Sequence, residues 1–110
     1  MLKNHRDVWL LALFLLASTP SRADAPEDIW RARCKTCHGD DGRGRTKVGL
    51  REHAPDFTTA KWQTQHPDDA IRNTIRNGSP QNKVMKSYKD RLGADEIDAL
   101  VRYLRAFKKA

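Results

Sequence analysis

Apolar residues three or four positions apart predict three helices, over residues 26–33, 67–77 and 94–108. The pattern of the third helix is the longest, and its apolar positions are Ile97, Leu100, Val101, Leu104 and Phe107. The middle pattern rests on two isoleucines four residues apart, and the first is short and runs directly into a cysteine. We therefore expect helices of unequal length, each with one buried face.

Residues at the ends of these patterns support the same limits. Pro26 suits the first position of a helix, and Gly78 suits a left-handed cap after the second helix. Before the third helix, Leu92 and Ile97 can pack against each other across a Gly93 cap. The helices are therefore expected to begin and end near the stated residues.

Two long stretches, residues 39–61 and 78–92, have almost no apolar periodicity and are predicted to be loops. No stretch has the alternation of a strand, and no repeat is present. Structureless loops of this length are uncommon inside a compact domain. They are understandable if they wrap a cofactor, so the pattern predicts an all-α fold around a bound group.

The first 23 residues have the order of a secretory signal. Basic residues come first, an apolar run follows over residues 8–17, and small residues surround Ala23. Ten apolar residues are too few for a membrane-spanning helix, which needs about 20. We expect cleavage after Ala23, a mature domain over residues 24–110 and a periplasmic location. A retained N-terminal anchor is the alternative.

The small size of the domain and its two cysteines strengthen the case for a bound cofactor that stabilises the fold. A domain this small buries only about 60% of its unfolded surface and usually needs a disulfide, a metal or another cofactor. The chain has two cysteines, which excludes a disulfide framework. It also has 21 Lys and Arg against 14 Asp and Glu, a net charge of +7.

The two cysteines form a motif with a specific chemistry. Cys34, Cys37 and His38 read as C-x-x-C-H, the haem c attachment sequence. Two thiols at this spacing on a helical turn reach the two vinyl groups of one porphyrin, and the adjacent histidine then lies under the iron. A redox dithiol is an alternative, but it favours a preceding strand. A zinc site needs a second ligand pair, and only His53 and His66 remain.

With this motif and its surroundings, the chain resembles the bacterial class I (monohaem) c-type cytochromes over nearly all of residues 24–110. The resemblance implies the cytochrome c fold, with three main helices and long loops around one covalent haem c. It also implies that the first helix crosses the last, so that Trp30 meets Leu100 and Tyr103. The implied function is one-electron transfer between redox partner proteins without bond chemistry, so an enzyme is not expected.

Met85 is the expected sixth iron ligand. It is the only methionine of the predicted mature chain and lies in a polar loop, where a core-filling methionine is not expected. The family has its methionine ligand in such a loop, although a proline often follows it and Lys86 follows here. His66 or His53 as the ligand, or an open sixth position, are the alternatives. An open position would give a haem protein that binds a small gas or handles peroxide.

The resemblance also implies two supporting roles. The Pro55 carbonyl would accept the second ring proton of His38, with Gly49 or Leu50 as alternatives. The Trp62 indole would donate to a haem propionate, although an ordinary core role is equally compatible with the sequence. These are the remaining expected cofactor contacts.

The positive charge predicts acidic partners. Lysines accompany both haem-binding segments and are expected around the haem edge: Lys35, Lys83, Lys86 and Lys89. Such a ring would steer the protein toward acidic patches on redox proteins. A generally basic surface is the alternative, because arginines are spread over the rest of the chain. Export and the absence of a recognition motif argue against nucleic acid, and we expect a monomer without a small-molecule substrate.

Overall fold

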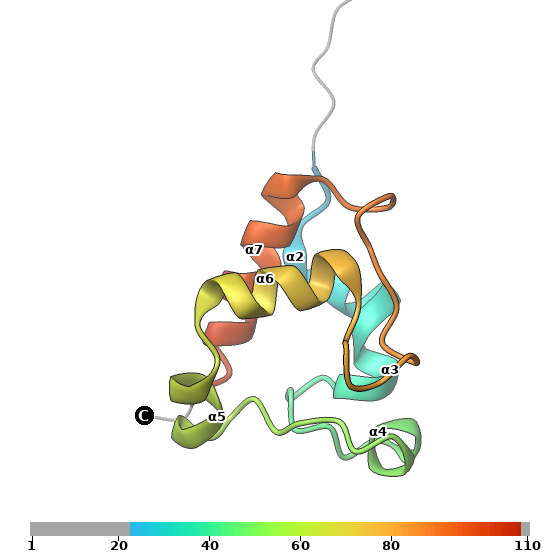
Figure 1. The fold of residues 1–110 in the computed structure, drawn as a ribbon, viewed down its shortest axis with the longest axis vertical. Coiled ribbons are helices and arrows are strands. Elements are labelled where there is room, and N and C mark those ends of the chain that lie inside the picture. Colours follow the sequence, from blue (N-terminus) through green and yellow to red (C-terminus); the bar gives the residue numbers. More distant parts are fainter. Residues whose placement is uncertain (1–22, 109–110) are drawn as a thin grey trace, which may run out of the picture.

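The computed structural model describes residues 23–108, which form helices and turns without any strand. The predicted secretory signal therefore lies, except for Ala23, outside the described residues. Within 23–108, no helix is long and apolar enough to cross a membrane. The helical segments, shown in Figure 1, are α2 (Pro26–Ile29), η1 (Trp30–Cys34), α3 (Lys35–His38), α4 (Lys47–Arg51), α5 (Ala60–Gln65), α6 (Asp68–Asn77) and α7 (Ala94–Arg105).

The first predicted helix is longer than expected. It continues past residue 33 through η1, a π-helical turn, and through α3, so that it contains the whole C-x-x-C-H motif. Pro26 occupies the start, as predicted, and Gly39 ends the helix with a φ of 80°. The motif therefore lies on helical backbone that is continuous with the buried residues Ile29 and Trp30.

The second and third predicted helices are confirmed, with small differences at their ends. Helix α6 begins one residue later than expected and ends at Gly78, whose φ is 87°. Helix α7 ends at Arg105 rather than 108. The predicted cap of α7 is present, because the Gly93 amide donates to Glu96 Oε1 at 2.9 Å.

The prediction of a loop over residues 39–61 is wrong, because this stretch contains α4 and the start of α5. A threonine caps each of these helices: Thr46 Oγ1 accepts from the Gly49 amide at 2.9 Å, and Thr59 Oγ1 from the Trp62 amide at 3.2 Å. Five or six residues are too few to show helical periodicity. Threonine caps are therefore the local signal that the sequence contains for them.

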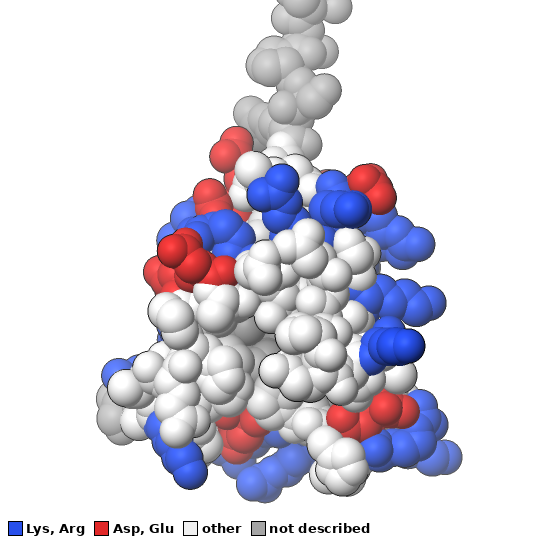
Figure 2. All heavy atoms as spheres, in the orientation of Figure 1, with Lys and Arg blue, Asp and Glu red and all other residues white. Residues whose placement is uncertain are grey.

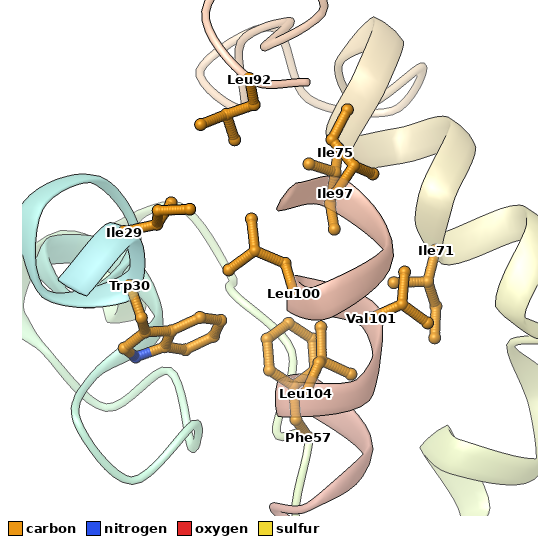
Figure 3. Packing of buried hydrophobic residues seen from close by; sticks show 10 residues of the cluster. All are labelled: Ile29, Trp30, Phe57, Ile71, Ile75, Leu92, Ile97, Leu100, Val101 and Leu104. Atoms are coloured by element: carbon orange, nitrogen blue, oxygen red, sulfur yellow. The ribbon is translucent and has the colours of Figure 1, made fainter. Parts of the chain in front are cut away.

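Helix α7 provides the centre of the core. Figure 3 shows its apolar stripe between Ile29 and Trp30 on one side and the isoleucines of α6 on the other. The Trp30 ring lies 5.4 Å from the Tyr103 ring between centroids, which confirms the crossing of the first and last helices. The ten buried apolar residues are Ile29, Trp30, Phe57, Ile71, Ile75, Leu92, Ile97, Leu100, Val101 and Leu104.

Candidate haem site

A cavity of about 610 Å³ is lined by the first helix, α5, α6, residues 52–57 and the segment between α6 and α7. This volume is in the range of about 300–1,000 Å³ that is typical of ligand sites. Every predicted site residue contributes to its wall: Cys34, Cys37, His38, Pro55, Trp62 and Met85. The fold thus brings together residues that are up to 51 positions apart in sequence.

Both motif cysteines are free thiols that are partly buried at the cavity wall. Burial raises the pKa of the Cys34 thiol to about 11. The thiol is therefore protonated at neutral pH and is a poor attacking group in disulfide exchange. These properties argue against the redox dithiol and leave two sulfur atoms available for one bound group.

His38 presents an unpartnered ring nitrogen. Its Nδ1 is buried and has no hydrogen-bond partner among the described residues, 23–108. Burial lowers the pKa of His38 to about 4, so the ring is neutral at physiological pH, which is the form that binds metals. Phe57 stacks on the ring at 4.9 Å between centroids, and Trp30 lies 5.8 Å away.

The segment after the motif is held by a set of short contacts. The Trp30 indole donates to the Gly39 carbonyl at 2.9 Å, and the Gly44 amide donates to the His38 carbonyl at 2.9 Å. Gly49 lies so close to the motif backbone that a Cβ atom at this position would overlap the Cys37 carbonyl oxygen. Helix α4 therefore packs directly on the backbone of the motif and limits how its side chains can move.

Thr46 connects the same two segments. Its hydroxyl donates to the Thr36 carbonyl at 2.6 Å and lies 3.1 Å from the Cys37 carbonyl, while it also caps α4. Sequence reasoning did not identify Thr46. The sequence contains a weak indication of this role, because threonine is one of the residues preferred at the N-cap of a helix.

Met85 is half-buried at the cavity wall. Its own backbone fixes the surrounding turn, since its amide donates to the Asn82 carbonyl at 3.2 Å and its carbonyl accepts from the Ser79 amide at 3.1 Å. Asn82 Nδ2 also donates to the Glu52 carbonyl at 3.1 Å. This last bond ties the methionine segment to the segment that follows α4, so the two loops close around one cavity.

Trp62 and His66 form a second aromatic wall. Their rings stack at 4.3 Å between centroids, and Trp62 also lies 4.5 Å from Phe57. His66 Nδ1 lies 2.7 Å from the Trp62 carbonyl, which fixes the imidazole orientation. Pro55 lines the cavity but makes no hydrogen bond with the orphaned Nδ1 of His38, so its expected role stays a prediction.

A buried amide and an arginine hold this aromatic wall on the core. Gln63 Nε2 donates to the Phe57 and Leu104 carbonyls at 2.7 and 3.2 Å. Arg105 donates to Gln63 Oε1 at 2.7 Å, to the Gln63 carbonyl at 2.9 Å and to the His66 carbonyl at 2.6 Å. The sequence did not predict this pairing of Gln63 with Arg105. The two residues are 42 positions apart, and no sequence motif relates them.

These residues fit a covalently attached haem. One cavity wall offers two free thiols, a neutral imidazole with an unpartnered nitrogen and a thioether sulfur. Apolar and aromatic side chains make up most of the remaining surface, as a porphyrin requires. In contrast, residues 23–108 contain no group of three or more His, Cys, Asp or Glu side chains arranged to hold a metal ion, so zinc is not supported.

One protein family matches most of the chain. The family described as "Cytochrome C oxidase, cbb3-type, subunit III" matches residues 21–104. Among curated proteins, the "Cbb3-type cytochrome c oxidase subunit FixP" of Rhizobium etli is 32% identical over 94 residues, or 83% of this chain. The subunit FixPc of Rhizobium leguminosarum bv. viciae is 30% identical over 81% of this chain.

The chain spans only about 29–31% of the length of these two relatives. Among solved structures, the KustC0563 c-type cytochrome superposes with a TM-score of 0.71 and is 36% identical. That alignment covers 78% of this chain and all of that one. The dihydro-haem d1 dehydrogenase NirN is 24% identical with a TM-score of 0.59, a likeness of fold alone.

Proposed function

This chain belongs to the cbb3-type cytochrome c oxidase subunit III family, and we propose that it is a one-electron carrier in a respiratory complex of that kind. It is a monohaem c-type cytochrome with one covalently bound haem c. When bound, the haem supplies an iron centre that cycles between Fe(II) and Fe(III). The observation that carries the proposal is the convergence of both thiols, His38 and Met85 on one cavity.

Each of these residues has a distinct task. Cys34 and Cys37 would hold the haem through thioether bonds, and His38 and Met85 would supply the nitrogen and the sulfur that bind its iron. A neutral His38 is ready to bind without losing a proton, because burial already lowers its pKa to about 4. With Met85 in place, the iron has no open position, which favours electron transfer over substrate chemistry.

The aromatic wall and Pro55 support the haem from outside the iron. Trp62 lines the cavity and stacks on His66, and its indole would donate to a haem propionate. The Pro55 carbonyl would accept from the second ring nitrogen of His38 and fix the ring, as outer partners of metal-bound histidines usually do. These assignments follow the same family resemblance as the ligands.

The surface around the cavity suits contact with a redox protein. Figure 2 shows a largely uncharged face with a central hollow, bordered mainly by Lys and Arg and in places by Asp and Glu. Val84 and Lys86 line the cavity, and Val84 is 48% exposed, so apolar and basic groups adjoin at its mouth. An acidic face of another subunit or soluble carrier, on the periplasmic side of the membrane, is the partner that this surface fits.

A gas-binding or peroxide-handling haem is the competing function. It requires an open iron position, which exists only if Met85 does not bind. Visible spectra of the haem-loaded protein distinguish the two functions. We expect low-spin spectra in both oxidation states, a weak far-red ferric band from Met–iron ligation, and no change of the ferrous spectrum under carbon monoxide. A high-spin spectrum or ready carbon monoxide binding would contradict the electron-carrier proposal.

A further inference from the structure

A second cavity, of about 350 Å³, lies between α6, α7 and the segment that joins them. Its volume also falls in the range of about 300–1,000 Å³ for ligand sites. Basic residues and apolar residues make up most of its wall, in contrast to the aromatic wall of the haem cavity. The residues that line it are Arg72, Arg76, Lys89, Leu92, Gly93, Ala94, Ile97 and Asp98.

Two of the three basic side chains are not neutralised. Arg72 is paired with Asp69 at 2.5 Å and with Asp98 at 2.6 Å. Arg76 and Lys89, in contrast, have no carboxylate within ion-pair distance among the side chains of residues 23–108. The cavity therefore carries two uncompensated positive charges in addition to one ion-paired arginine.

The backbone holds these two residues side by side. The Lys89 amide donates to the Arg76 carbonyl at 3.0 Å, and Ser87 Oγ donates to the same carbonyl at 2.7 Å. These bonds attach the segment before α7 to the C-terminal turn of α6. Two positive side chains on adjoining backbone segments that line one cavity favour an anion, because a bound carboxylate reduces their mutual repulsion.

The floor of the cavity is apolar and belongs to the core. Leu92 and Ile97 are buried, and Leu92 lines the haem cavity as well. Leu92 is thus the residue that the two cavity walls share. The basic residues of the second cavity differ from Lys86, which lines the haem cavity, so the second cavity presents a separate surface.

We propose that this second cavity is a docking site for an acidic segment of a partner protein, which inserts one carboxylate and an adjacent apolar side chain. The carboxylate pairs with Arg76 and Lys89, and the apolar side chain covers Leu92 and Ile97. Charge complementarity selects the occupant, because an acidic segment supplies the charge that the cavity lacks. Docking there leaves the mouth of the haem cavity free for a second redox protein.

The test is a titration of the haem-loaded ferrous protein with the end-blocked tripeptide Glu-Leu-Glu at low ionic strength, followed by amide chemical shifts in NMR spectra. We expect saturable shifts centred on residues 89–97. The double variant R76Q/K89Q should weaken binding by about tenfold or more, because it removes both counter-charges. The double variant R45Q/K61Q, which loses the same charge at exposed sites outside both cavities, should bind within about twofold of the parent.

Three results would overturn the docking site: no saturable shifts, equal weakening in both double variants, or shifts centred on the Met85 segment. Inorganic phosphate is titrated in parallel. If phosphate binds residues 89–97 as tightly as the peptide, the cavity is a small-anion site and the apolar floor plays no part. Unchanged visible spectra of all variants separate these outcomes from any failure of haem binding.

Discussion

The indole nitrogen of Trp30 donates a buried hydrogen bond of 2.9 Å to the carbonyl oxygen of Gly39, directly after the haem motif. The bond joins the core-facing start of the first helix to the residue at which the helix ends. Gly39 has a φ of 80°, and its carbonyl also accepts from the Gly42 amide at 3.3 Å, so it joins the end of the helix to the turn that follows. Trp30 therefore anchors the backbone turn that carries His38.

Replacing Trp30 by Phe tests this anchor. The change keeps an aromatic ring but removes the shorter of the two hydrogen bonds to the Gly39 carbonyl, which costs about 0.5–1.5 kcal/mol of unfolding free energy. Denaturant unfolding of the haem protein measures the loss. Tyr103→Phe is the control, since it removes a hydroxyl that makes no hydrogen bond with any group of residues 23–108, and it should change stability by less than about 0.5 kcal/mol. Equal losses in both variants would mean that the hydrogen bond contributes nothing.

Replacing Met85 by Ala tests the sixth ligand. Without the thioether the ferrous state loses its stabilising ligand, so the reduction potential should fall by a sizeable part of the roughly 0.8 V range that axial ligands span. The iron should also become open to carbon monoxide. Potentiometric titration and spectra under carbon monoxide measure both effects. The neighbouring Val84→Ala should leave them unchanged, and an unchanged potential in Met85→Ala would refute the assignment.

Replacing Arg105 by Gln tests the hydrogen bonds from Arg105 to Gln63 and His66, which hold the aromatic wall. The variant loses charge-assisted bonds to Gln63 and His66, which predicts a loss of about 1.5–3 kcal/mol of unfolding free energy. Far-UV circular dichroism during denaturant unfolding measures it. Arg102→Gln, an exposed arginine on the same helix, is the matched control and should lie within about 0.5 kcal/mol of the parent. If the two variants were equally stable, these hydrogen bonds would have no energetic role.

Replacing Lys83 and Lys86 by Gln tests electrostatic steering at the haem edge. Electron transfer to membranes that contain a cbb3-type oxidase should slow several-fold as ionic strength rises from about 0.01 to 0.15 M, because salt screens exposed charges. The double variant should be slower at low salt and less sensitive to salt. Stopped-flow spectroscopy measures the rates, with R45Q/K61Q as the charge-matched control. A parent rate that does not depend on salt would remove the steering argument.

The sequence predicted those features that depend only on residues close together along the chain. Helices α6 and α7 were foreseen within three residues because each has enough turns to show an apolar stripe and a recognisable cap. The haem motif can be predicted from the sequence because its chemistry depends on three residues within a span of five, and the roles of these residues stay a prediction. The crossing of Trp30 and Tyr103 came from the family resemblance, and the structure confirms it.

What the sequence did not reveal depends on contacts between distant segments. Helix α4 is too short to show periodicity and is stabilised by its Thr46 cap and by Gly49 packing on Cys37. The pairing of Gln63 with Arg105 joins residues 42 positions apart, and a single polar residue in a short helix gives no sign of burial. The basic cavity between α6 and α7 likewise appears only when the two helices are in place.

The size of the haem cavity has a consequence for how the protein survives in a cell. Without the haem, the apolar side chains that line this cavity of about 610 Å³ would face water instead of a porphyrin. The haem-free chain is therefore expected to be less stable than the loaded protein, because a group that binds only the folded state stabilises it. A less stable chain spends more of its time open to proteases, so loading with haem would also protect the chain from degradation.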